Sequence, residues 1–413
     1  MKNKKFLCLV FLLVFVFFMG SPFSLFAKKI HKAIKAGDVD LVMELINKKK
    51  GINSRDRSGA TPLMLAAAEG QMEIIEALIG AGAKINKKNQ GWTSLMYAAW
   101  KGRTKAAELL LKQGADIHPR NNYGGTPLFV AVDWGYKDTA LLLIENGSEI
   151  KMKDIDLKTP LMMAAKTGLT EVARLMVEKG AEIKSRTNQD WTPLMYAALG
   201  GEPEIAELLI EKGADIHHRN KFKATPLYIA AWSGCAEVVK RLAEKGADID
   251  VKCKNNWTPL QAAGYNNHLE VIDVLLSAGA KLQIIEKSAH DIYAAATIRK
   301  LLAEKAKKEG NIEKAAAHYR SAAERFEKAA TAYVKLAKKA GGRAVLKALI
   351  GAVWSVAELA YVKKTGRRSR ISSQDFDWST RNLKKFKKQC KMRVEMSQKL
   401  AAECKQLAGQ LKK

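Results

Sequence analysis

The stretch that decides the fold is residues 61–83, TPLMLAAAEGQMEIIEALIGAGA, whose pattern returns along the chain. A Thr-Pro-Leu triplet occurs six times, and Thr93-Ser94-Leu95 is a variant seventh copy. Successive copies are 32 residues apart once and 33 apart five times. A fixed period of this length predicts stacked structural units rather than one globular core. The six triplets begin at Thr61, Thr126, Thr159, Thr192, Thr225 and Thr258.

Each part of the motif has a physical reason to stand where it does. Threonine caps a helix because its hydroxyl accepts a hydrogen bond from an unpaired backbone N–H. Proline suits the first helical position, where no N–H is needed. The paired alanines that follow let neighbouring helices approach closely. A glycine three residues later suits the turn into a second helix, and Asn267 takes that place in the last copy. The second helix is expected to end at Gly-Ala.

This pattern resembles the ankyrin repeat over roughly residues 29–282. The resemblance implies an all-α solenoid of about eight helix–turn–helix units with β-hairpin loops, in which residues 30–46 form a capping first unit. The histidine that usually follows Thr-Pro-Leu in this family, and ties repeats together by hydrogen bonds, is absent here. We expect apolar packing to replace it. The residues at this place are Met64, Met96, Phe129, Met162, Met195, Tyr228 and Gln261.

The N-terminus predicts export from the cytoplasm. Three lysines within residues 1–5 precede an apolar run over 6–19, and Ala27 stands before Lys28. This order is typical of a signal peptide, here residues 1–27, although an uncleaved anchor is the alternative. We therefore expect a periplasmic or secreted protein. The cysteines that remain, Cys235, Cys253, Cys390 and Cys404, are compatible with disulfides or with unpaired buried thiols.

Aromatic residues concentrate at repeat positions that the ankyrin resemblance places on the concave groove. These positions are the loop tip before the threonine and the end of the first helix. Tryptophan and tyrosine are enriched among interface anchors, so the pattern predicts a groove that binds a protein or peptide. The alternatives are rings packed between repeats as a ladder, or rings that stack on a glycan. The predicted partner-binding residues are Trp92, Trp100, Tyr123, Trp134, Trp191, Phe222, Trp232, Trp257 and Tyr265.

The C-terminal third differs from the repeats in charge. Residues 283–413 carry 31 Lys and Arg against 12 Asp and Glu, so most of the chain's net charge of +28 lies there. Residues 283–340 are expected to form a helical hairpin, in which 306–323 resemble a tetratricopeptide unit. The basic helical tail, 341–413, contains an apolar stretch at 344–362. This stretch is either a buried helix or a membrane span, and its two internal charges favour the buried helix.

The basic side chains of this tail predict contact with an anionic membrane surface. Nucleic acid is the competing partner, but export argues against it. A solvated charged helix without a partner is the third interpretation. The residues expected to bind the anionic surface are Lys363, Lys364, Arg367, Arg368, Arg370, Lys384, Lys385, Lys387 and Lys388.

Catalytic and metal-binding motifs are missing from the sequence. The histidines show no metal-ligand spacing, and neither a P-loop nor a dinucleotide fingerprint is present. We therefore expect a non-enzymatic scaffold without a cofactor, binding a partner in the periplasm or cell envelope. The alternatives are a secreted effector that binds host proteins and a membrane-tethered adaptor that uses the basic tail.

Overall fold

The computed structural model describes residues 22–48, 51–253, 255–282, 288–339, 395, 398–399 and 401–406, with residues 22–28 and 333–339 described by their backbone alone. The chain forms two units, Met1–Asn188 and Gln189–Lys413. All regular elements in the described residues are helices, which confirms the all-α prediction. The predicted signal segment up to residue 21, the apolar stretch 344–362 and the basic residues 363–388 lie outside the described residues.

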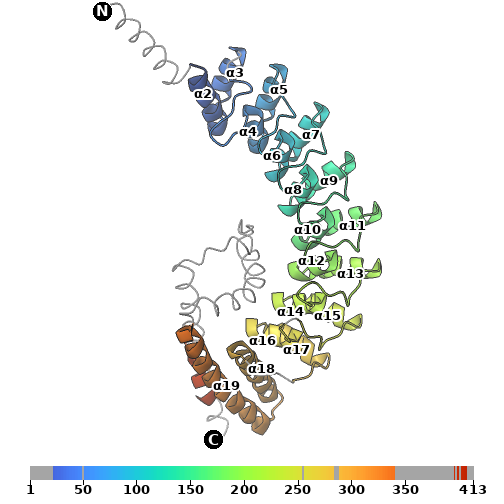
Figure 1. The fold of residues 1–413 in the computed structure, drawn as a ribbon, viewed down its shortest axis with the longest axis vertical. Coiled ribbons are helices and arrows are strands. Elements are labelled where there is room, and N and C mark those ends of the chain that lie inside the picture. The colour runs from blue at the N-terminus through green and yellow to red at the C-terminus, as the bar shows by residue number, and fades with distance from the viewer. Residues whose placement is uncertain are drawn as a thin grey trace, which may run out of the picture. The chain divides into compact units, whose positions relative to one another are not determined.

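Unit 1 is a stack of helix pairs in two layers (Figure 1). The first helices of successive pairs pack side by side, and so do the second helices. Each first helix therefore packs one face against the second helix of its own pair and its two flanks against the first helices of the neighbouring pairs. The pairs are α2 (Pro22–Ala36) with α3 (Val39–Asn47), α4 (Pro62–Glu69) with α5 (Met72–Gly80), α6 (Ser94–Trp100) with α7 (Thr104–Lys112), α8 (Pro127–Asp133) with α9 (Lys137–Glu145), and α10 (Pro160–Thr167) with α11 (Thr170–Glu178).

Unit 2 continues the same pairing and ends in two longer helices. Within it, α18 packs against α16, and α19 packs along α18 (Figure 1). These two helices show that the region after the repeats is helical, as the predicted fold class requires. The elements are α12 (Pro193–Gly200), α13 (Pro203–Glu211), α14 (Pro226–Ser233), α15 (Ala236–Glu244), α16 (Pro259–Asn266), α17 (Leu269–Ser277), α18 (Ala289–Lys308) and α19 (Ile312–Lys339).

The predicted helix caps are present. Thr61 Oγ1 accepts a hydrogen bond from the Met64 N–H, and the threonine of each later copy caps its own helix in the same way. Asn267 adopts the left-handed conformation, with φ of 60°. The position that usually holds histidine keeps a polar role in part. Met64 Sδ accepts the Thr61 N–H at 3.3 Å, and Gln261 Oε1 accepts the Thr258 N–H at 3.1 Å. Apolar packing therefore replaces the histidine only in part.

The loops between successive repeats are tight hydrogen-bonded turns. In the turn of residues 121–125, the Asn121 N–H donates to the Gly125 carbonyl at 3.0 Å, while Asn121 Oδ1 accepts from two backbone N–H groups. Of the β-hairpins that the resemblance implied, the described residues contain one isolated antiparallel bridge, between Asn89 and Trp92. Since these turns are only about five residues long, side-chain acceptors such as Asn121 do much of the bonding that strands would otherwise provide.

Ser94 allows a test of whether proline at the first helical position stabilises the repeat. It occupies the first position of α6, where the other six copies have proline, and its buried hydroxyl has no hydrogen-bond partner in the described structure. The preceding Thr93 has the extended conformation that proline requires, with φ of −103° and ψ of 169°. We expect Ser94→Pro to stabilise unit 1 by about 0.5–1 kcal/mol, measured as a higher urea midpoint. Ser94→Ala, which removes only the hydroxyl, is the matched control, and a lower midpoint for the proline variant would contradict the prediction.

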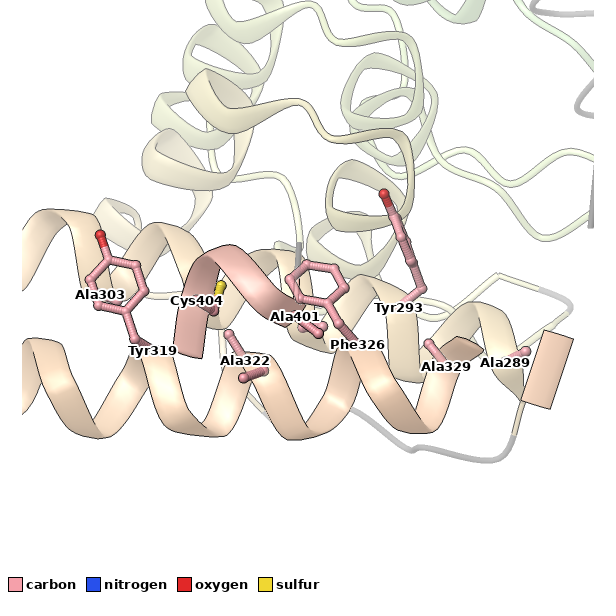
Figure 2. Close-up of a cluster of buried hydrophobic side chains, with 11 residues drawn as sticks. Ala289, Tyr293, Ala303, Tyr319, Ala322, Phe326, Ala329, Ala401 and Cys404 are labelled. Atoms are coloured by element: carbon pink, nitrogen blue, oxygen red, sulfur yellow. The ribbon is translucent and has the colours of Figure 1, made fainter. Parts of the chain in front are cut away.

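The two C-terminal helices form a small bundle with the helical residues 401–406 (Figure 2). Phe326 and Tyr319 from α19 and Tyr293 from α18 are almost fully buried together with Ala401 and Cys404. Tyr265 of α16 packs against this cluster, so the bundle continues the repeat core of unit 2.

Gly264 explains how closely the bundle approaches the last repeat. The other repeats have alanine or valine at this position. A Cβ at Gly264 would lie 2.8 Å from the Ala294 carbonyl oxygen and 3.0 Å from the Ile298 side chain. Because real Cβ contacts are longer than this, α18 packs closer to α16 than an alanine would allow.

Candidate functional site

Three repeat positions bring side chains together along a first helix and the turn before it. They are the residue before the threonine and those four and seven positions after it, which share one helical face. In the repeat of α6 all three are aromatic. The Trp92 ring centroid lies 5.8 Å from Tyr97 and 6.4 Å from Trp100, and each pair is edge-on. Tyr97 was missing from the sequence prediction, although its spacing from Trp92 and Trp100 would have revealed it.

The next repeat extends this group. The ring centroids of Trp100 and Trp134 are 6.0 Å apart, with an angle of 80° between the planes. Trp134 is 49% exposed, while Trp92 and Trp100 are half-buried. Lys101 Nζ lies 4.1 Å from the centroid of the Trp100 ring, within the range of a cation–π interaction. We call Trp92, Tyr97, Trp100 and Trp134 the aromatic cluster of unit 1.

Exposed apolar side chains also occupy two neighbouring turns of unit 1. Tyr123 is 54% exposed, and the Ile155 N–H of the next turn donates to its carbonyl at 3.1 Å. Ile155 is 60% exposed, and Leu157 has φ of 61° in a turn position that holds glycine at Gly124. Leucine in this conformation costs free energy relative to glycine. Ile155 and Leu157 were not among the predicted residues, because the sequence pattern assigns them only to a turn.

The aromatic residues of unit 2 differ from this arrangement and correct one expectation. Trp232 was expected to face the groove, yet it is only 7% exposed. Its ring centroid lies 6.1 Å from Trp257 and 6.0 Å from Tyr265, and both of these residues are half-buried. Neighbouring repeats therefore cover Trp232, as in the alternative ladder of packed rings.

The row of rings in unit 2 continues into the C-terminal bundle. The Tyr265 centroid lies 5.0 Å from His290 and 6.3 Å from Tyr293, and Tyr293 lies 5.6 Å from Phe326. These rings are part of the core that joins the repeats to the bundle. Of the remaining predicted residues of this unit, Trp191 is half-buried and lies 5.5 Å from Tyr196, and Phe222 is 36% exposed.

No metal-binding site is present among the described residues. They contain no group of His, Cys, Asp and Glu side chains that could hold a metal ion. His218 Nε2 lies 2.9 Å from the Asp190 carbonyl oxygen of the preceding turn, which is a structural contact. Cys253 and Cys404 are buried with free thiols, and burial raises the pKa of Cys404 to about 11. Cys390 lies outside the described residues.

In the ranges that the structure describes, none of the helices is both long enough and apolar enough to cross a bilayer. The predicted membrane-contact residues, from Lys363 to Lys388, fall outside those ranges.

The chain consists of paired helices that are joined by tight turns and carry a recurrent, capped Thr-Pro-Leu motif. These features define a helical-repeat protein that presents side chains on its turns and on the first helix of each pair. The family model for ankyrin repeats matches three times, at residues 30–121, 151–220 and 215–286, and the chain belongs to this family. Ankyrin repeats are protein–protein interaction modules, so the chain carries a protein-interaction domain. Nothing in the family match indicates catalysis, and the tetratricopeptide resemblance receives no support.

Two similar proteins illustrate the extent of the match. Ankyrin repeat, SAM and basic leucine zipper domain-containing protein 1 of Carollia perspicillata is 42% identical over 55 residues, which are 13% of this chain and 12% of that protein. The crystal structure of the human ASB11 ankyrin repeat domain is 27% identical, with a TM-score of 0.49. It covers 54% of this chain and 99% of its own. The chain thus spans only about an eighth of the length of its curated relative.

Proposed function

We propose that this protein is an exported, non-enzymatic scaffold that binds a protein partner through the aromatic cluster of unit 1 and the adjoining turns. The observation that carries the proposal is the exposure of Trp134 and Tyr123, at 49% and 54%. Large aromatic side chains left in solvent are typical of interaction sites rather than of a surface without a function.

The angles between the rings favour a protein side chain over a glycan. Successive planes in the aromatic cluster meet at 78° and 80°, so the rings share no flat face. Edge-to-face contact is the arrangement that aromatic protein side chains adopt with one another, so an aromatic side chain of a partner can join these rings in the same geometry. A glycan ligand is therefore the less favoured alternative.

Export and membrane contact are the parts of this proposal that rest on the sequence. The basic start and apolar run of residues 1–27 support a periplasmic or secreted location, and a secreted effector remains the alternative. The run of basic residues between 363 and 388 supports a second contact with an anionic membrane surface. Such a contact would tether the scaffold at the cell envelope.

Affinity capture from the native host tests the proposal. The full chain would be compared with the double variant Trp134→Ala and Tyr123→Ala, and with Leu269→Ala as a control of similar exposure in unit 2, at 41%. We expect the wild type and the control to capture the same proteins and the double variant to lose them. An unchanged set of proteins captured by the double variant would contradict the proposed binding surface. A chain that stays in the cytoplasm with residues 1–27 attached would contradict the proposed export.

A further inference from the structure

One position of the repeat carries a periodic charge. It is the second residue after the glycine that ends each second helix. In five successive repeats this residue is acidic, while the copies before and after them have lysine. The lysines are Lys84 and Lys281, and the acidic residues are Asp116, Glu149, Glu182, Asp215 and Asp248.

Glu182 shows what the acidic residue does. Lys153 directly precedes the turn that begins at Asp154, and its Nζ lies 3.2 Å from Glu182 Oε2 of the next repeat. Hydrogen bonds from Ser185 and then Lys153 lower the pKa of Glu182, so its carboxylate is stabilised. At this contact between two successive repeats, which we call a junction, the acidic Glu182 thus neutralises the basic Lys153, 29 positions before it.

At Lys84 the same junction has the opposite charge. The residue 29 positions earlier is Arg55, which precedes the turn at Asp56 as Lys153 precedes its own. Arg55 Nη2 donates to the Lys88 carbonyl at 3.0 Å, and Lys87 Nζ donates to the Asn53 carbonyl at 2.7 Å. We call Arg55, Lys84 and Lys87 the basic cluster of unit 1.

Among the described residues, no carboxylate forms an ion pair with the basic cluster. Burial, and after it the charges of Arg55 and Lys84, lower the pKa of Lys87, so both of these cations repel the Lys87 ammonium group. None of the ion pairs between described residues includes any of the three, and nearby Asp56 instead pairs with Lys35 at 3.3 Å. An anion from outside the chain would relieve this repulsion.

The basic cluster adjoins the aromatic cluster. Lys88, whose carbonyl receives the Arg55 guanidinium, is followed by Asn89, and Asn89 and Trp92 exchange backbone hydrogen bonds of 2.9 and 2.8 Å. A partner that lies across Trp92 is therefore near Arg55, whose guanidinium contacts the residue before this turn.

Together these observations lead us to propose that the basic cluster binds carboxylates of an acidic segment in the protein partner. The segment places apolar side chains against Trp92 and its neighbours, and its carboxylate takes the place that Glu182 fills at the later junction. A guanidinium and two ammonium groups can hold such a carboxylate by charge-assisted hydrogen bonds. This inference rests on the proposed function, since it specifies the partner of the same surface.

Charge reversal at Lys84 tests the inference. The probe is a fluorescent peptide of alternating glutamate and leucine, titrated against the full chain at low salt, with a glutamine–leucine peptide for comparison. We expect Lys84→Glu to weaken binding of the glutamate peptide about tenfold, because an attraction becomes a repulsion. The fold should persist, since the new glutamate can pair with Arg55 as Glu182 pairs with Lys153.

Lys281→Glu is the matched control. It makes the same change in net charge at the same repeat position. The acceptor of the backbone N–H differs between the two sites: it is the acidic Asp250 for Lys281, at 3.0 Å, and the neutral Asn53 for Lys84, at 2.8 Å. We expect this control to bind the peptide like the wild type. Equal binding by wild type and Lys84→Glu, no binding by the wild type, or equal binding of the glutamine peptide would overturn the inference.

Two further measurements distinguish a lipid headgroup from a protein carboxylate, and the carboxylate site from the aromatic cluster. If Lys84→Glu instead abolished binding to phosphatidylglycerol vesicles while the peptide did not bind, the anion would be a lipid headgroup and the inference would be wrong. If Trp134→Ala left peptide binding unchanged while Lys84→Glu weakened it, the carboxylate site would stand and the aromatic part of the proposed function would fail.

Discussion

Replacing Phe326 with alanine is expected to lower the unfolding free energy of unit 2 by about 3–5 kcal/mol. The Phe326 side chain has 0% exposure and packs against Tyr293 and Ala401, from two other segments of the bundle (Figure 2). Its removal would leave a cavity that three separate helical segments line, so the structure could not easily collapse into it. Urea denaturation followed by tryptophan fluorescence would measure the loss, because Trp257 lies close to Tyr265 at the edge of this core.

Cys404 supplies a second readout of the same variant. Its thiol is fully buried and has a pKa of about 11, so it should react slowly with iodoacetamide in the wild type. Loosening of the bundle in Phe326→Ala should speed this labelling, detected on the Cys404 peptide by mass spectrometry. Ile312→Ala is the control on the same helix, since Ile312 is 44% exposed. A loss below about 1 kcal/mol, with unchanged labelling, would show that the bundle is not part of the core.

Trp134→Ala is expected to weaken binding of the protein partner by at least about 2 kcal/mol, or roughly 30-fold in Kd. Trp134 is the most exposed ring of the aromatic cluster, and it lies edge-on to Trp100 at 6.0 Å. Its truncation removes the most exposed apolar surface of the aromatic cluster. Calorimetric titration with the captured partner would measure the change.

The expected loss is one of binding and not of folding. Because half of the Trp134 side chain is already in solvent, its truncation should change stability by only about 0.5 kcal/mol. Trp232→Ala provides the opposite pattern, since this ring is buried between repeats and its loss should cost about 3–5 kcal/mol of stability. An unchanged Kd for Trp134→Ala, or a stability loss as large as that of Trp232→Ala, would contradict the assignment of Trp134 to the binding surface.

The repeat architecture could be predicted because its signals are local. Thr61 caps α4 through a hydrogen bond to a residue three positions away, and Asn267 takes a left-handed conformation that few other residues accept easily. Such interactions depend on residues within one turn of a helix. The two C-terminal helices also depend on local interactions, since Ser288 caps α18 and Gly310 has a positive φ in the turn before α19.

The candidate site could be predicted only in part. Spacing placed Trp92, Trp100 and Trp134 on one side of the repeats, where the structure brings their rings together. Exposed Ile155 and Leu157 were missed because a turn pattern says nothing about which apolar side chains remain in solvent. The basic cluster was missed because the like charges of Arg55 and Lys84 are 29 residues apart in the sequence.

By itself, the amino-acid sequence determined the helix pairs, their caps and the register that brings aromatic residues to one side. Only the tertiary structure decided which of these rings reach solvent. Trp100 and Trp232 occupy the same repeat position, yet the first remains half-exposed while the second lies beneath Trp257 and Tyr265. The physical reason is that burial depends on neighbours about 33 residues away, and in unit 2 also on the distant bundle around Tyr293 and Phe326.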